Sequence, residues 1–207
     1  MKTTNEQGEK VVGVLGGMGP EATIDFMRRI LAATPAEDDR DHIRMLIDHN
    51  PKVPSRIEAL VEGTGPSPAP VLQQMARSLE SRGADFLAMP CNTAHHYLPE
   101  IEAAVHIPIL NMIALTAEQV VTQHPKSRQV GLFASTAVFK TGLYESAFDE
   151  RGIKLGGPAG SGQEDVMKII RAVKRKQHDR EHLTHLNSLA EEMAGRGYDM
   201  FVIGCTE

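Results

Sequence analysis

The chain has 207 residues, of which 41% are hydrophobic and 24% charged, and its formal net charge at pH 7 is −5. This composition is typical of a globular protein with one larger domain or two small ones. The negative charge argues against a general nucleic-acid-binding protein. Residues 1–10 lack the apolar stretch of a signal peptide, and no apolar run approaches the ~18 residues that a membrane span requires. We therefore expect a cytoplasmic protein whose two cysteines are thiols.

Strand-like and helix-like segments alternate along the whole chain. In the first half the sequence predicts a strand at 11–15, a helix at 21–33, a strand at 43–48, a helix followed by a short strand within 72–91, and a strand at 107–110. In the second half it predicts a helix at 114–123, a strand at 129–133, a helix at 141–151, and a helix followed by a short strand within 186–205. This order predicts parallel sheets with helices on both faces.

An internal repeat is the most informative feature of the sequence. The segment 72–91, LQQMARSLESRGADFLAMPC, resembles the segment 186–205, LNSLAEEMAGRGYDMFVIGC, at a constant offset of 114 residues. Each copy consists of an amphipathic helix, a glycine C-cap and an apolar strand that ends on a cysteine. The strand at 129–133 likewise matches the strand at 11–15 at an offset of 118 residues.

The repeat predicts two pseudo-symmetric three-layer α/β domains with mainly parallel sheets, covering residues 1–115 and 116–207. Cys91 and Cys205 then lie at equivalent strand ends. Ligands of parallel sheets bind at the carboxyl ends of the strands, so we expect both thiols in one cleft between the halves.

Two thiols on opposite sides of a cleft suit the inversion of a carbon centre. One face needs a base and the other an acid, and the roles must exchange in the reverse direction. An isolated thiol has a pKa of about 8.5, close enough to neutrality for a thiol and a thiolate to coexist. Cys91 precedes Asn92, Thr93 and Ala94, which are suited to opening a helix whose backbone N–H groups favour a thiolate. Thr206 occupies the corresponding place after Cys205.

Three motifs carry a family resemblance that spans nearly the whole chain. They are GVLGGMGP at 13–20, PCNTAH at 90–95 and GCTE at 204–207. Together they resemble the signatures of the aspartate/glutamate racemase superfamily, and the Cys-Thr-Glu sequence is similar to the aspartate racemase branch. The resemblance implies a racemase that uses neither pyridoxal phosphate nor a metal, acts on a small amino-acid substrate and forms a homodimer.

Two further segments resemble the substrate-binding positions of the superfamily. The segment 50–56 ends on Arg56, which the resemblance implies grips a carboxylate, and a guanidinium can do so with two hydrogen bonds. The segment 166–174 ends on Lys174, the position implied to supply a lysine to the same pocket. We expect Asn92 and Thr93, with backbone N–H groups near Gly17, Met18 and Gly19, to bind the α-carboxylate.

Other functions remain open at the level of the sequence. Residues 17–22 fit a short dinucleotide fingerprint, and Asp48 ends the next strand, so a nucleotide-binding oxidoreductase is one alternative. His178, His182 and His185 have a spacing that could hold a metal, but the sequence favours the polar flank of an amphipathic helix over a metal site. A dicarboxylate-binding protein without catalysis, a broad-specificity racemase and a maleate- or hydantoin-type isomerase are the others.

The resemblance also implies a further helix and strand after the Cys-Thr-Glu sequence. The first half continues past its cysteine to the strand at 107–110, and residues 116–207 contain no counterpart of that continuation. A helix that begins after Cys205 would help to stabilise a thiolate there. We therefore expect the 207-residue chain alone to be less stable and less active than a longer form.

Overall fold

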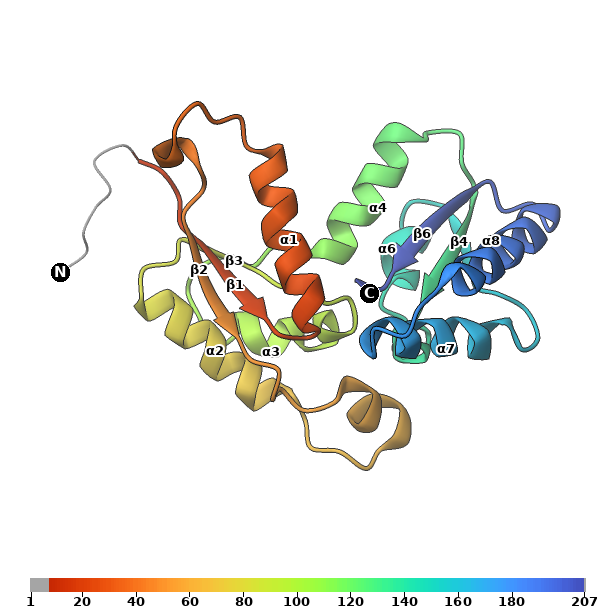
Figure 1. The fold of residues 1–207 in the computed structure, drawn as a ribbon, viewed down its shortest axis with the longest axis horizontal. Helices are drawn as coiled ribbons and strands as arrows, with labels where there is room; N and C mark the ends of the chain where they lie inside the picture. Colours follow the sequence, from red (N-terminus) through yellow and green to blue (C-terminus); the bar gives the residue numbers. More distant parts are fainter. Residues whose placement is uncertain (1–7, 207) are drawn as a thin grey trace.

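The computed structural model describes residues 8–206 and contains two three-stranded parallel sheets, one in each half of the chain (Figure 1). The first sheet has the order β2-β1-β3 and consists of β1 (Val12–Gly16), β2 (Met45–His49) and β3 (Phe86–Ala88). The second has the order β5-β4-β6 and consists of β4 (Gln129–Ala134), β5 (Lys154–Gly156) and β6 (Met200–Gly204). The predicted α/β class with parallel sheets is therefore confirmed.

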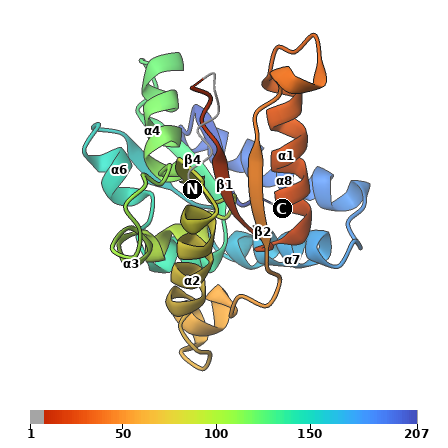
Figure 2. The same ribbon diagram turned by 90° about the vertical axis from the view of Figure 1, so that its left-hand side faces the viewer.

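The first half places helices on both faces of its sheet. Helix α1 (Pro20–Ala33) covers one face, and α2 (Ala69–Ser81) and α3 (Leu98–Glu102) cover the other (Figures 1 and 2). Successive side chains of β1 alternate between the faces. Val12 and Val14 pack with Phe26 of α1, whereas Leu15 packs with Leu72 of α2. Short helical turns, η1 (Asp39–Asp41), η2 (Glu58–Glu62) and η3 (Thr93–Tyr97), complete this half.

The second half repeats this layering. Helices α7 (Gly162–Lys174) and α8 (Arg180–Gly195) pack on one face of the sheet, through Phe133 of β4. Helices α4 (Met112–Gln123), α5 (Thr136–Lys140) and α6 (Glu145–Asp149) lie on the other face, where Leu132 of β4 is buried. Within residues 8–206, no helix is long and apolar enough to cross a membrane.

The repeat seen in the sequence is reproduced in the strand pairing. Gly13 of β1 pairs with Leu87 of β3, and Gly131 of β4 pairs with Phe201 of β6. A Cβ atom at Gly13 would lie 2.6 Å from Leu87, and one at Gly131 would lie 2.5 Å from Phe201. Both strands therefore need glycine at the same point, because the neighbouring side chain fills the space above it.

Two predicted elements differ from the structure. The helix predicted at 141–151 is shortened to α6, Glu145–Asp149, because residues 141–144 form a turn in which Gly142 adopts φ +61°. A left-handed residue cannot continue a right-handed helix. The strand predicted at 107–110 is reduced to a single bridge between Ile109 and Leu87.

Candidate active site

A cavity of about 290 Å³ lies between the two halves, at the carboxyl ends of the strands. The arrowheads of β1 and β6 point toward one another from the two halves (Figure 1). Cys91 follows β3 and Cys205 follows β6, so equivalent strand ends deliver one thiol from each half. The predicted site residues that line this cavity are Met18, Arg56, Cys91, Asn92, Thr93, Lys174, Cys205 and Thr206.

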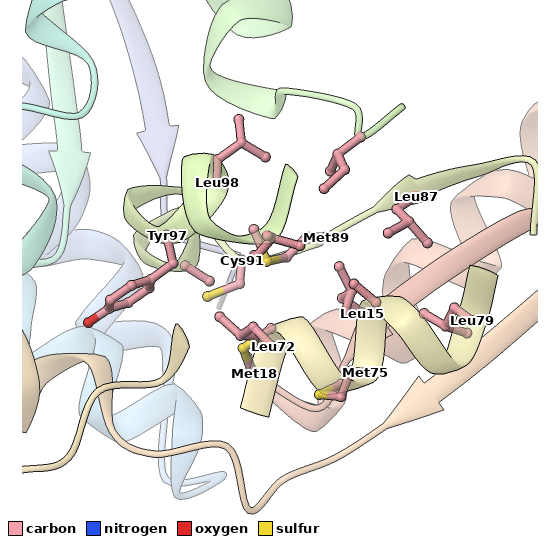
Figure 3. Packing of buried hydrophobic residues seen from close by; sticks show 14 of the residues in the cluster. Leu15, Met18, Leu72, Met75, Leu79, Leu87, Met89, Cys91, Tyr97 and Leu98 are labelled. Atoms are coloured by element: carbon pink, nitrogen blue, oxygen red, sulfur yellow. The ribbon is translucent and has the colours of Figure 1, made fainter. Parts of the chain in front are cut away.

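Cys91 lies at the edge of the core of the first half. It is buried in the cluster that contains Leu72 and Met18. Its side chain points toward the end of that cluster where Met18 and Tyr97 lie (Figure 3). The turn η3 begins two residues later with Asn92 as its N-cap residue, as the sequence predicted for the position after this thiol. Cys205 is half-buried and packs against the α7–α8 cluster of the second half.

Three hydrogen bonds join the loop that carries Cys91 to the second half of the chain. They connect Thr206 Oγ1 to the Pro90 carbonyl at 3.2 Å, the Tyr144 hydroxyl to Asn92 Oδ1 at 2.5 Å, and the hydroxyl groups of Thr93 and Ser135 at 3.1 Å. Because all three bonds flank Cys91, they fix this loop relative to the half that carries Cys205.

The guanidinium of Arg56 is held at the cavity by backbone carbonyl groups. It donates to Pro54 at 3.1 Å, to Met18 at 3.4 Å and to Val53 at 3.5 Å. A guanidinium has five N–H donors in a planar fork, so anchored in this way it still has donors for a ligand. Lys174 ends α7 and lines the cavity with an exposed side chain.

The glycine turn after β1 differs in part from the prediction. Gly17 adopts φ +92°, and a Cβ atom there would lie 2.4 Å from the Asn50 backbone, so only glycine fits. Its N–H group donates to Thr23 Oγ1 at 2.9 Å and is thus used inside the fold rather than for a ligand. Gly19 does not line the 290 Å³ cavity but an adjoining groove of about 1220 Å³, which also reaches Cys205.

His95 connects the Cys91 loop to the start of α4. Its Nδ1 lies 2.8 Å from the Cys91 carbonyl, and its Nε2 accepts from the Met112 N–H at 3.1 Å. An acceptor at Nε2 places the proton of the neutral ring on Nδ1. Burial lowers the pKa of His95, although the carbonyl groups of Cys91 and Leu110 oppose this effect. The neutral ring thereby ties the thiol loop to the start of α4.

This arrangement predicts an acid-sensitive stability. As the pH falls below about 6.5, an unfolded histidine takes up a proton while buried His95 resists it, so the unfolded state binds more protons. The free energy of unfolding should therefore fall from pH 7.5 to pH 5.5. The free energy of unfolding of His95→Gln should be about 1 kcal/mol lower than that of the parent at pH 7.5, because the glutamine side chain fits the two hydrogen bonds less well. Its free energy of unfolding should also fall less between pH 7.5 and pH 5.5 than that of the parent. Urea unfolding at both pH values measures this.

His96 provides the matched control, because it is the neighbouring histidine and is exposed. His96→Gln should follow the parent protein at both pH values. A His95→Gln variant whose stability declines as steeply as that of the parent would show that another group causes the acid sensitivity.

The sequence did not single out two residues that complete the site, Ser135 and Tyr144. Ser135 is 5% exposed and binds Thr93. A signal for it existed, because Ser135 matches Gly17 at the offset of 118 residues that relates β1 to β4. Tyr144 is 1% exposed and has no such signal, because it falls inside the helix that the sequence predicts at 141–151.

Two of the three histidines whose spacing could hold a metal, His182 and His185, have carboxylate partners. His182 Nδ1 lies 2.7 Å from Asp179 in the N-terminal cap of α8, and His185 Nε2 lies 3.2 Å from Asp165. These contacts favour a polar helix flank. Across residues 8–206, no group of three or more His, Cys, Asp or Glu side chains is arranged to hold a metal ion.

The fold and the cavity define a two-domain α/β protein with one thiol on each side of a cleft. The family model of the Asp/Glu/Hydantoin racemases matches residues 15–207, and the chain belongs to this family. The structure is similar to Picrophilus torridus aspartate racemase, with a TM-score of 0.79, 33% identity, and coverage of 95% of this chain and 81% of that chain.

A further relative and a further solved structure are also similar to this chain. The broad specificity amino-acid racemase RacX of Bacillus subtilis (strain 168) is 28% identical over 210 residues, which cover 95% of this chain and 85% of RacX. The glutamate racemase isoform RacE1 from Bacillus anthracis shares the fold, with a TM-score of 0.60, 17% identity, and coverage of 96% of this chain and 68% of that chain. Amino-acid racemases are isomerases, which places this chain among the isomerases rather than the nucleotide-binding oxidoreductases.

Proposed function

We propose that this chain racemises an acidic amino acid, aspartate above all, by proton transfer between Cys91 and Cys205 without a cofactor. One observation carries the proposal: the two cysteines, from equivalent strand ends of the two halves, line one cavity. The aspartate racemase of Picrophilus torridus, at 33% identity, supports the choice of substrate.

The proposed reaction moves one proton off the α-carbon and another onto it. The thiolate on one face takes the α-proton and becomes a thiol, and the pair of electrons left on carbon delocalises into the carboxylate. The thiol on the opposite face then donates its proton to the same carbon and becomes a thiolate. The two cysteines end with exchanged protonation states, so the next turnover in the same direction requires proton exchange with solvent.

The polar lining of the cavity has a role in this reaction. Asn92 and Thr93 bind the α-carboxylate, which gains negative charge as the carbanion forms, and fixed donors stabilise that charge. Thr206 and the turn at Met18 and Gly19 contribute further contacts to the substrate from other sides of the cavity and the adjoining groove. Arg56 and Lys174 bind the side-chain carboxylate, which an amino acid with an apolar side chain lacks.

A broad-specificity racemase is the second candidate, and two observations favour it. RacX of Bacillus subtilis is similar over 95% of this chain. The cavity also carries Glu58 and Glu62 from η2 beside its cationic residues, so it offers partners of both charges to a substrate side chain. A maleate- or hydantoin-type isomerase and a dicarboxylate-binding protein without catalysis are further outcomes that the experiment below separates.

The cellular location, oligomeric state and domain division of the enzyme are part of the same proposal. We place it in the cytoplasm, as a homodimer, with two units that cover residues 1–115 and 116–207. Sedimentation analysis tests the dimer, and a single sedimenting species with the mass of one chain contradicts it.

The experiment follows the α-proton of L- and D-aspartate by NMR in D₂O, with protein and no added cofactor. We expect the proton signal of both enantiomers to disappear and chiral analysis to show both forms. The same assay with glutamate, alanine and lysine separates an acidic from a broad specificity. If a folded protein exchanges none of these protons, racemisation is wrong, and maleate, hydantoin and dicarboxylate binding are the functions to test.

A further inference from the structure

Tyr144 lies between the two loops that carry the thiols. One edge of its ring lies against Gly204, the residue before Cys205, because a Cβ atom added at Gly204 would be 3.4 Å from Tyr144 Cε2. Its hydroxyl donates to Asn92 Oδ1 at 2.5 Å, next to Cys91. A single side chain, 1% exposed, therefore contacts the backbone before one thiol and the side chain after the other.

The chain fixes this side chain in place. The turn at Gly142 ends α5, and Tyr144 becomes the N-cap residue of α6. Its ring lies 6.1 Å from that of Phe148, centroid to centroid, in the buried cluster on the α4–α6 face of the sheet. A buried tyrosine of this kind has few alternative positions, so its hydroxyl is a fixed donor.

The protonation of the phenol supports the same role. Burial raises the pKa of Tyr144 to about 12, the Thr116 hydroxyl opposes this effect, and a charge on Cys205 adds to it. The hydroxyl thus keeps its proton at any pH at which a thiol and a thiolate coexist. The Asn92 side chain is 5% exposed, and its Oδ1 accepts the hydrogen bond from Tyr144. This hydrogen bond fixes the orientation of the amide and leaves its NH₂ group as the donor for a ligand.

We propose that Tyr144 is a positioning residue for racemisation, which holds the Asn92 amide so that its N–H groups meet the substrate carboxylate. This inference rests on the proposed function. The carboxylate gains charge as the carbanion forms, so a fixed donor stabilises the transition state more than the bound substrate. Removing the Tyr144 hydroxyl should therefore lower kcat and leave KM nearly unchanged.

The test is Tyr144→Phe, which keeps the buried ring and removes one oxygen atom. We expect kcat for aspartate to fall roughly 5- to 20-fold while KM changes less than about threefold, as for the loss of one oriented donor. In an Asn92→Ala background the same change should have no further effect, because Tyr144 acts through the amide. Equal kcat in parent and Tyr144→Phe, or losses that multiply in the double variant, would overturn the inference.

Ile153→Val is the matched control, a change in the same buried cluster at a residue outside both thiol loops. It should lower the melting temperature and leave kcat and KM unchanged. A second readout does not depend on activity: the side-chain NH₂ signals of Asn92, identified by their loss in Asn92→Ala, should shift in Tyr144→Phe and not in Ile153→Val. If the parent exchanges no α-protons, the proposed function fails, whereas unshifted NH₂ signals in Tyr144→Phe refute the positioning role itself.

Discussion

Replacing either cysteine by serine should lower aspartate racemisation by roughly 10²- to 10⁴-fold, the range that one positioned proton-transfer group contributes. A serine hydroxyl cannot serve as the base at neutral pH. The remaining thiolate can still remove the α-proton of the enantiomer that faces it and return a deuteron to the same face. Cys91→Ser and Cys205→Ser should therefore each retain exchange with one enantiomer, and with opposite enantiomers. NMR in D₂O, with chiral analysis of the product, measures both quantities.

Met89→Leu provides a control for disturbance of the core near Cys91. Met89 is 3% exposed, packs in the same cluster as Cys91 and does not line the 290 Å³ cavity. A swap that nearly conserves volume should cost less than about 1.5 kcal/mol and leave racemisation within about twofold. If both serine variants still exchange the α-proton of both enantiomers, the two-thiol mechanism is wrong. If only one serine variant is affected, a single cysteine serves both faces.

The internal repeat explains why so much of the fold was predictable. A helix, a glycine directly after the helix C-cap and a strand occur twice, and the two glycines, Gly83 and Gly197, adopt φ +96° and +94°. A local pattern of this kind determines where each strand ends and hence where each cysteine lies. The position of the cavity at the carboxyl ends of the strands agrees with the rule for ligand sites in parallel sheets.

The parts that were not predicted depend on contacts between segments distant in the sequence. Tyr144 reaches Asn92, 52 residues away, only because Gly142 interrupts a run that otherwise has a helical pattern. Gly17 was expected to present its N–H group to a ligand, yet Thr23 on the following helix accepts it. Neither the partner of a buried polar group nor the φ angle of one glycine is encoded in hydrophobic periodicity.

Arg56 is where the proposed preference for an acidic substrate can be tested most sharply. Its guanidinium is anchored by the carbonyl groups of Pro54, Met18 and Val53, which fixes the direction of its other N–H groups. A lysine keeps the charge but cannot bind these carbonyl groups and a carboxylate with a planar fork. Arg56→Lys therefore removes the planar arrangement of N–H donors and preserves the positive charge.

We expect Arg56→Lys to lower kcat/KM for aspartate roughly 10- to 100-fold, as for the loss of a charge-assisted bidentate pair. Alanine lacks the side-chain carboxylate, so any activity on alanine should change less than about threefold. Arg171→Lys is the matched control, since Arg171 also lines the cavity and is exposed; it should leave both substrates near the parent values. Steady-state rates with the two amino acids measure this. Equal losses on aspartate and alanine would instead assign Arg56 to the α-carboxylate, and the preference for an acidic side chain would then have to come from Lys174.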